Sequence, residues 1–484
     1  MNAKPNRRLE LSRDEMRALG YKVVDMIVDH VEALPEKPAT RTATRQEMEH
    51  LLRESLPEQG TNFLEVLEHL EQNVFSNMMH QDHPRYFAFV SGPGNYVSAM
   101  ADALVSGLNV FNGTWMESSG PALIELMAID WLREMCQLPE TAGGIFVSGG
   151  SQANLHALAV ARYVKLHNHM EGARLYCSDQ THSSIERGMR VLGFQPEQMV
   201  KVPSDENYHI LLPELRRMVA EDRAAGLRPF CVVANIGSTN TGAIDPLPEM
   251  AQFCREEDLW FHGDAAYGGA VILSERKSHM LTGMDQLDSV TIDPHKWLFQ
   301  PYEMGCVMVR NKRYLRDTFR LVPEYLLDVD SKNEEEINFY DYGVQLTRGF
   351  RALKLWMSLK VFGAESFRQA VDWGIGLAEL AQRTVENLPN WEITSPAWTS
   401  VTSFRYTRPD VLSLEEEDEL NKEIVNRMTE DGYAFLSTTI LKGRVVVRMC
   451  IINPRTTEGD ILGTILRLNR HAEEIFRERV LVDS

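Results

Sequence analysis

Several features that mark membrane, secreted or metal-binding proteins are missing from this 484-residue sequence. No apolar run approaches the length of a membrane-spanning helix, and the first fifteen residues hold no apolar segment typical of a secretory signal. The six cysteines are scattered without a C-x-x-C pair, which argues against a zinc module and a dense disulfide framework. We therefore expect a cytoplasmic protein with buried free thiols.

Basic residues are too few to balance the acidic ones. The formal net charge is −19, which repels phosphate backbones and disfavours general nucleic-acid binding, although a local pocket for one small phosphate stays compatible. Hydrophobic residues make up 44% of the chain, enough for a sizeable core. The length predicts two or three folding units.

The first 82 residues have the pattern of helices. Ser12 with Glu15 and Thr44 with Glu47 have the spacing of capping boxes ahead of amphipathic runs, and a third such run covers residues 63–74. Three helices without a strand cannot easily bury their apolar faces alone. We expect this segment to pack on a larger domain or on a second subunit.

From His83 onward, short apolar runs alternate with helical patterns. Near-continuous apolar strands between helices predict an α/β domain over residues 83–360 with a mostly parallel sheet. Residues 361–484 combine four strand-like runs with an acidic-start helix, and the sequence LKGR between the last two runs suits a hairpin. This part is expected to be a smaller α/β domain.

A glycine-rich turn leaves the apolar run GGIFV and opens a helix, in the sequence SGGSQAN from Ser148 to Asn154. Glycines let backbone amides approach an anion, and the helix N-terminus adds partial positive charge. Taken alone, the turn is better explained as an ordinary glycine turn in which Ser151 caps the helix.

Two more polar residues follow strand-like runs. Asp264 ends the run LWFHGD, and Lys296 follows SVTIDPH. Alone, Asp264 could simply cap the turn after it, and most lysines are solvated. Together with the glycine turn, however, they match the needs of pyridoxal 5′-phosphate (PLP): a held phosphate, an acid near the ring nitrogen and an amine for the aldehyde.

SVTIDPHKW, HPRYFAF, VSGGSQAN, SDQTHSS, DAAYGG and LTRGFRALKLW together resemble the group II PLP-dependent decarboxylases, in the order and spacing of that family. The likeness to bacterial tryptophan-type decarboxylases is strongest. It implies an α/β fold of the aspartate aminotransferase type (fold type I), with a mostly parallel seven-stranded sheet. It also implies a homodimer with active sites at the subunit interface.

The resemblance assigns catalytic roles to particular residues. Lys296 would hold PLP as a covalent imine, and Asp264 would partner the ring nitrogen. His182 would stack on one face of the ring, and Ala266 would touch the other. Tyr325 would protonate the substrate carbon after carbon dioxide leaves; without the resemblance it would read as a tyrosine packed on a helix.

The resemblance also implies the rest of the cofactor site. Gly150 and Ser151 would hold the phosphate with His295. Asp293, which replaces an asparagine of the animal enzymes, would contribute through its backbone, because a carboxylate facing a phosphate is repulsive. Thr239 would lie on the hydroxyl side of the cofactor.

Substrate-binding candidates come from the same resemblance. Phe89 matches a pocket position, and Phe111 and Leu346 match positions that reach the partner's site, although core packing would also explain all three. Gly92 and Gly113 replace larger residues, which suggests a roomier pocket for an indole. Three arginines are candidates for holding carboxylates, but structural ion pairs explain them more simply: Arg348, Arg351 and Arg448.

We therefore expect decarboxylation of an aromatic L-amino acid to its amine. Glutamate or aspartate decarboxylation and aromatic aldehyde synthesis are the alternatives within the same cofactor chemistry. A non-catalytic scaffold is disfavoured by the joint presence of Lys296, Asp264, His182 and Tyr325. A serine hydrolase at Ser151 is disfavoured by the absence of a G-x-S-x-G elbow. No metal site is expected.

Overall fold

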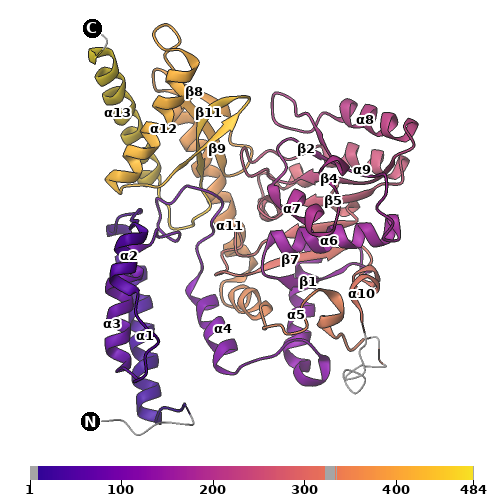
Figure 1. The fold of residues 1–484 in the computed structure, drawn as a ribbon, viewed down its shortest axis with the longest axis horizontal. Helices are drawn as coiled ribbons and strands as arrows, with labels where there is room; N and C mark the ends of the chain where they lie inside the picture. Colours follow the sequence, from indigo (N-terminus) through magenta and orange to yellow (C-terminus); the bar gives the residue numbers. More distant parts are fainter. Residues whose placement is uncertain (1–8, 322–332, 334, 483–484) are drawn as a thin grey trace.

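The computed structural model describes residues 9–321, 333 and 335–482, and its ribbon has three parts (Figure 1). An N-terminal helical arm is followed by a large unit built on one sheet and by a small unit built on another. Two hydrophobic cores occupy the two units.

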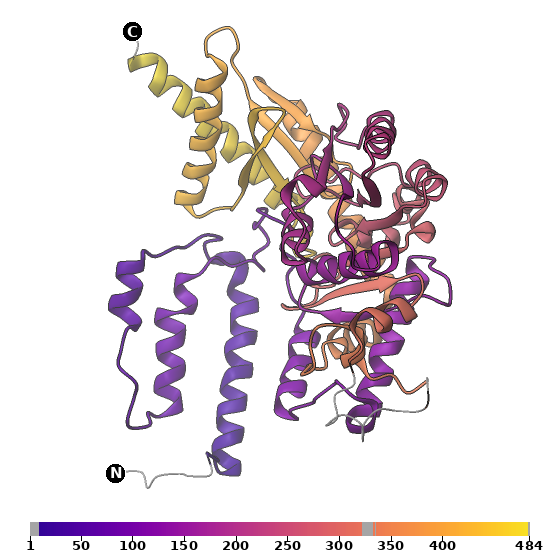
Figure 2. The same cartoon turned by 45° about the vertical axis from the view of Figure 1, so that its right-hand side comes forward.

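The N-terminal arm is purely helical, as predicted. Both capping boxes form: the side chains of Ser12 and Thr44 accept the amides of Glu15 and Glu47, whose carboxylates accept in return. Yet no residue of the three helices is buried. The helices stand side by side, clear of the two sheets (Figure 2). The arm comprises α1 (Arg13–Ala33), α2 (Arg45–Leu52) and α3 (Phe63–Asn73).

The large unit contains the predicted seven-stranded sheet, in the order β1-β7-β6-β5-β4-β2-β3. Pairing is parallel from β6 through β3, while β7 runs antiparallel to both of its neighbours. The sheet is therefore mostly parallel, and β1 runs in the same direction as β6. Its strands are β1 (Gly143–Val147), β2 (Ala173–Ser178), β3 (Met199–Val202), β4 (Arg228–Asn235), β5 (Trp260–Asp264), β6 (Ser289–Ile292) and β7 (Gly305–Val309).

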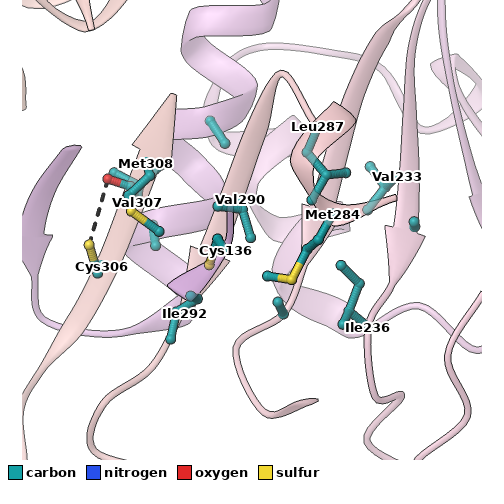
Figure 3. Close-up of a cluster of buried hydrophobic side chains, with 14 of the residues drawn as sticks. Cys136, Val233, Ile236, Met284, Leu287, Val290, Ile292, Cys306, Val307 and Met308 are labelled. Atoms are coloured by element: carbon teal, nitrogen blue, oxygen red, sulfur yellow. Dashed lines mark hydrogen bonds between the residues drawn. The ribbon is translucent and has the colours of Figure 1, made fainter. Parts of the chain in front are cut away.

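Burial along the strands shows that the centre of this sheet is covered on both faces. Successive side chains point to opposite faces of a sheet, yet every residue of β1, β5, β6 and β7 is buried. Side chains such as Val290, Ile292 and Val307 form this core (Figure 3). The helices of the large unit are α4 (Tyr96–Gly107), α5 (Trp115–Met135), α6 (Gly150–Leu166), α7 (Ser183–Val191), α8 (Leu212–Ala224), α9 (Leu247–Glu256) and α10 (Arg313–Phe319).

The small unit is a four-stranded antiparallel sheet in the order β10-β11-β9-β8 with two helices. The predicted hairpin turns at Lys442 and Gly443, both of which have positive φ. Its elements are β8 (Trp391–Ser395), β9 (Val401–Tyr406), α12 (Leu414–Asp431), β10 (Ser437–Leu441), β11 (Arg444–Cys450) and α13 (Glu458–Val482).

The two ends of the large unit differ in detail from the borders predicted at residues 82 and 360. The predicted border at residue 360 lies inside α11 (Ala352–Glu386), which breaks at Gly363, where φ is 75°. At the other border, Phe87 exchanges backbone hydrogen bonds with Phe435 and Cys450 and lies in the small unit's core. The segment assigned by sequence to the large domain therefore starts by pairing with the small one.

All six cysteines are buried and free, as expected from their spacing. Cys136 and Cys306 lie among apolar core residues, as Figure 3 illustrates. Within the described part of the chain, no helix combines the length and the apolar character needed to cross a membrane.

Candidate active site

One cavity of about 350 Å³ lies at the carboxyl ends of the parallel strands of the large sheet. This is the edge at which α/β sheets bind ligands, because loops and helix N-termini converge there. The predicted cofactor residues all line it, so the structure brings together what the sequence had spread over 147 positions: Gly150, Ser151, His182, Thr239, Asp264, Ala266, Asp293, His295 and Lys296.

The glycine turn before α6 forms a cradle for an anion. Gly149 is the N-cap of α6, and no side chain caps the helix there. A Cβ on Gly150 would lie 2.7 Å from an Asp293 carboxylate oxygen and 3.2 Å from the Ala266 methyl. A Cβ on Gly149 would lie 2.9 Å from the His295 ring. Glycine is therefore required at both positions, and it leaves the positive end of α6 open to a phosphate.

Asp264 closes β5 and is held by two donors. The amide of Asn154 on α6 donates to its Oδ2 at 2.9 Å, and the backbone N–H of Ala266 donates to its Oδ1 at 3.2 Å. Asp264 as a whole is 9% exposed, and it lines the cavity. Two donors and no acceptor suit an ionised carboxylate, which can hold a protonated ring nitrogen.

Lys296 is paired with a carboxylate at the floor of the cavity. Its Nζ lies 3.2 Å from Oδ2 of Asp293, a residue that is only 3% exposed. The same oxygen is 3.5 Å from Nε2 of His295. The prediction that Asp293 acts through its backbone is therefore incomplete: its side chain faces the cavity, because the neighbouring amine compensates its charge.

His182 is the N-cap of α7 and opens onto the same cavity. Its Nδ1 accepts the backbone N–H of Ser184 at 3.2 Å and lies 2.9 Å from the Ser184 hydroxyl. Desolvation lowers the pKa of His182, and the nearby Asp264 charge opposes this effect only in part. Burial therefore favours the neutral imidazole.

The predicted substrate residues do not join this cavity within one chain. Phe89 is 57% exposed and Leu346 is 43% exposed, while Phe111 is half-buried. None of them, nor Gly92, lines the cavity. Exposed apolar side chains near a site suit a pocket that another chain completes. Tyr325 lies outside the described residues.

The two substitutions to glycine do not enlarge the pocket in this chain. A Cβ on Gly92 would lie 1.8 Å from the Lys296 carbonyl oxygen, so the backbone itself fills that space. A Cβ on Gly113 would lie 2.2 Å from the Phe111 ring. Neighbouring atoms therefore occupy the space beside both glycines, which leave no added room for an indole in this chain.

The three arginines have structural partners, as the simpler reading predicted. Arg348 forms an ion pair with Glu125 at 2.6 Å, and both side chains are fully buried. Arg351 pairs with Glu303 at 2.8 Å. Arg448 donates to the carbonyls of Thr239 and Phe89 and thereby fixes two segments beside the cavity.

Sequence reasoning missed several cavity residues, including Asn154, Ser184 and Tyr267. Asn154 carried a usable signal, because it lies four positions after Gly150 on the same face of α6. Tyr267 stacks on Trp297 and exchanges hydrogen bonds with Ser400 of the small unit. It therefore ties the cavity wall to the second domain.

The residues present fit PLP. An open helix N-terminus, a doubly held carboxylate and a lysine amine surround one cavity, and these are the partners for its phosphate, ring nitrogen and aldehyde. The cavity volume is within the range of small-molecule sites. The fit rests on three separate strand ends and not on a single motif.

Comparisons with known proteins agree with this fit. Residues 45–407 match the pyridoxal-dependent decarboxylase conserved domain. The chain is 48% identical over 467 residues to an aromatic-L-amino-acid decarboxylase of Bacillus atrophaeus, covering 96% of this chain and 97% of the relative. It is 28% identical to tryptophan decarboxylase 2 of Oryza sativa subsp. japonica, covering 97% of each chain.

A solved structure shows the same architecture. The crystal structure of Oryza sativa TDC with PLP and tryptamine superposes with a TM-score of 0.92 at 27% identity, covering 98% of this chain and 99% of that one. The fold is thus the predicted PLP-dependent fold type I. With the cavity, the matched domain and these relatives in agreement, the chain belongs to the pyridoxal-dependent decarboxylases, enzymes that use PLP to remove the carboxyl group of an amino acid.

Proposed function

We propose that this enzyme decarboxylates aromatic L-amino acids to the corresponding amines and carbon dioxide. The observation that carries the proposal is the single cavity in which Lys296, Asp264 and the α6 N-terminus meet. The aromatic preference is supported by the relative that is 48% identical and named an aromatic-L-amino-acid decarboxylase. Tryptophan, phenylalanine, tyrosine and DOPA are the substrates to compare.

Each polar group at the cavity has a separate task in this proposal. When bound, PLP supplies an electron sink for the pair of electrons left by the departing carboxyl group. Lys296 would hold its aldehyde carbon until the substrate amine takes its place. Asp264 would keep a proton on the ring nitrogen, while Gly150 and Ser151 would hold the phosphate.

Positioning and proton transfer complete the chemistry. His182 would stack against the cofactor ring, which confines the substrate to one face. Tyr325 would return a proton to the substrate carbon; this role rests on the sequence resemblance. Phe89, Phe111 and Leu346 would contact the aromatic side chain from two subunits.

We also propose a homodimer as the working form. The three arm helices have no buried residue, and they expose large apolar side chains such as Met16 and Leu64, which are 56% and 48% exposed. A second copy that covers these helices would remove that surface from water. A cytoplasmic location is proposed because all six cysteines are free thiols.

The function is tested by steady-state kinetics over a panel of amino acids, with carbon dioxide, amine and peroxide measured together. We expect the highest kcat/KM for an aromatic substrate, with one amine formed per carbon dioxide and no peroxide. A preference for glutamate or aspartate would overturn the aromatic assignment. Peroxide and ammonia release would instead identify an aldehyde synthase.

The cofactor linkage has its own test. Borohydride reduction followed by peptide mass spectrometry should place the pyridoxyl group on Lys296, and Lys296→Ala should lower kcat by about 10³-fold or more. Lys277→Met is the matched control, because Lys277 is also half-buried and ion-paired but lies away from the cavity. Label on any other lysine would contradict the assignment.

A further inference from the structure

A chain of buried polar side chains runs behind Asp264 and is not explained by packing alone. Asn154 donates from its amide nitrogen to Asp264 at 2.9 Å and to the Ser184 hydroxyl at 2.8 Å. Its amide oxygen lies 3.0 Å from Nε2 of His262. Asn154 is 1% exposed and His262 is 0% exposed, so water cannot substitute for these partners.

The direction of this chain follows from its chemistry. An ionised Asp264 only accepts hydrogen bonds, so Asn154 must turn its amide nitrogen toward it and its oxygen toward His262. His262 must then donate from Nε2. Burial lowers the pKa of His262 to about 4, which favours a neutral ring. With the proton on Nε2, its Nδ1 is left as an acceptor, although the Ser289 carbonyl also lies 3.2 Å from it. The Ser289 hydroxyl, 2.9 Å away, donates to it, while Trp260 donates to the Ser289 oxygen at 2.8 Å.

A branch of the same chain reaches the second catalytic candidate. The Ser184 oxygen accepts from Asn154, which leaves the Ser184 hydroxyl proton to donate to Nδ1 of His182 at 2.9 Å. The backbone N–H of Ser184 also donates to that nitrogen. With Nδ1 occupied as an acceptor, a neutral His182 carries its proton on Nε2.

We propose that His262 and Asn154 are positioning residues, which form a one-way hydrogen-bond relay from Trp260 to the catalytic site. The relay keeps Asp264 as an acceptor for the protonated ring nitrogen and fixes the tautomer of His182. This inference rests on the proposed roles of Asp264 and His182. Neither His262 nor Asn154 exchanges a proton with the substrate.

Ser289 offers the sharpest perturbation, since its removal changes little volume. In Ser289→Ala, His262 loses the donor to Nδ1 and can place its proton there, donating to the backbone carbonyl of residue 289 at 3.2 Å. Its Nε2 then becomes an acceptor and no longer supports the amide orientation of Asn154. The reversal reaches Asp264 although neither Ser289 nor His262 lines the cavity.

The experiment measures two properties of the holoenzyme variants: the dissociation constant of PLP and the pH midpoint of the visible absorbance of bound PLP. His262→Leu should weaken PLP binding about tenfold and move the midpoint by about one pH unit. His262→Gln retains a side-chain N–H and should recover most of both. Ser289→Ala should shift both in the same direction, about threefold in affinity. All of these variants keep the side chains of Lys296 and Asp293, the charged pair at the cavity.

Two buried residues outside the relay serve as controls. His156→Leu removes an equally buried histidine whose ring bonds to Gln152 and Val344, and Ser358→Ala removes a buried hydroxyl on α11. Both should leave the midpoint unchanged even where the melting temperature falls. If His262→Leu and Ser289→Ala also change only the melting temperature, the relay is overturned.

Two further outcomes keep the test decisive. If His262→Leu does not fold, Ser289→Ala decides alone, since it alters one hydroxyl. If the wild-type enzyme takes no label on Lys296, the proposed function fails and not the relay, because the relay is judged only on variants of a PLP-loaded wild type. An unshifted Ser289→Ala midpoint beside intact labelling counts against the relay alone.

Discussion

The helical arm and the large sheet reach their structures by different routes. In the sheet, β1, β5, β6 and β7 are buried along their whole length, so tertiary packing holds them. In the arm, α1, α2 and α3 contain no fully buried residue and are supported by caps such as Ser12 and Thr44. Local signals can thus specify a helix, whereas its stability must come from packing, for which we propose a second copy of the chain.

The largest expected effect tests whether buried contacts stabilise the large sheet. In Arg348→Met, the fully buried Glu125 loses its ion-pair partner, so we expect a loss of about 3–5 kcal/mol in the free energy of unfolding. Urea denaturation followed by circular dichroism measures it. Arg368→Met removes an exposed pair with Glu365 and should cost less than about 1 kcal/mol. Equal losses would contradict the burial argument.

The second effect would break the arm's side. Met16→Asp combined with Leu64→Asp places charges on the exposed apolar helices, and we expect the dimer dissociation constant to rise roughly 100-fold, or about 3 kcal/mol. Light scattering across a concentration series measures it. Ile440→Asp, on an exposed apolar position of the small unit, is the control. A wild-type chain that is a stable, active monomer would defeat the dimer.

The next effect is the loss of stability of the large unit in acid. Burial lowers the pKa of His156 in the large unit to about 4, below its unfolded value near 6.5. Between these two pKa values the unfolded chain binds more protons than the folded one. The contribution of His156 to the free energy of unfolding is therefore fully present above pH 6.5 and is lost as the pH falls toward 4. We expect about 3 kcal/mol from this group. Urea denaturation at several pH values should show a shallower slope in His156→Leu; an unchanged slope would refute it.

The smallest effect is confined to the arm. Thr44→Ala removes the capping box of α2 and should cost about 1 kcal/mol in local helix stability. Hydrogen exchange should accelerate for the first amides of α2, with little change in the melting temperature of the body. Thr42→Ala, two residues before the cap, is the control. Faster exchange in the large sheet would show that the arm and body are coupled in one chain.

Much of the fold and site could be predicted because the signals are local. The capping boxes at Ser12 and Thr44 fixed helix starts, and apolar runs fixed most strands. Gly150, Asp264 and Lys296 converge because each follows a strand, and parallel strands end at one edge. β3 was missed, since it has only four residues, one of them Lys201, and lies at the edge of the sheet.

What could not be predicted depends on distances between distant segments. The roles of Asn154 and His262 arise because α6 packs against β5, which no spacing in the sequence records. The glycine at position 92 is explained only by the Lys296 carbonyl beside it. Asp293 was expected to contribute through its backbone, and the pairing of its side chain with Lys296 could not be read from the sequence.

Because of where the cysteines lie, their reactivity reports the unfolding of the two hydrophobic cores. All six lie after the arm, and burial raises the pKa of Cys136 and Cys177 to about 12, so a thiol-reactive dye finds neither access nor thiolate in the native state. The dye would react, and its colour would develop, only when the large and small units unfold. Detachment of the arm would expose no cysteine and would give no colour. The rate of dye reaction would therefore measure unfolding of the two cores separately from dissociation of the proposed dimer.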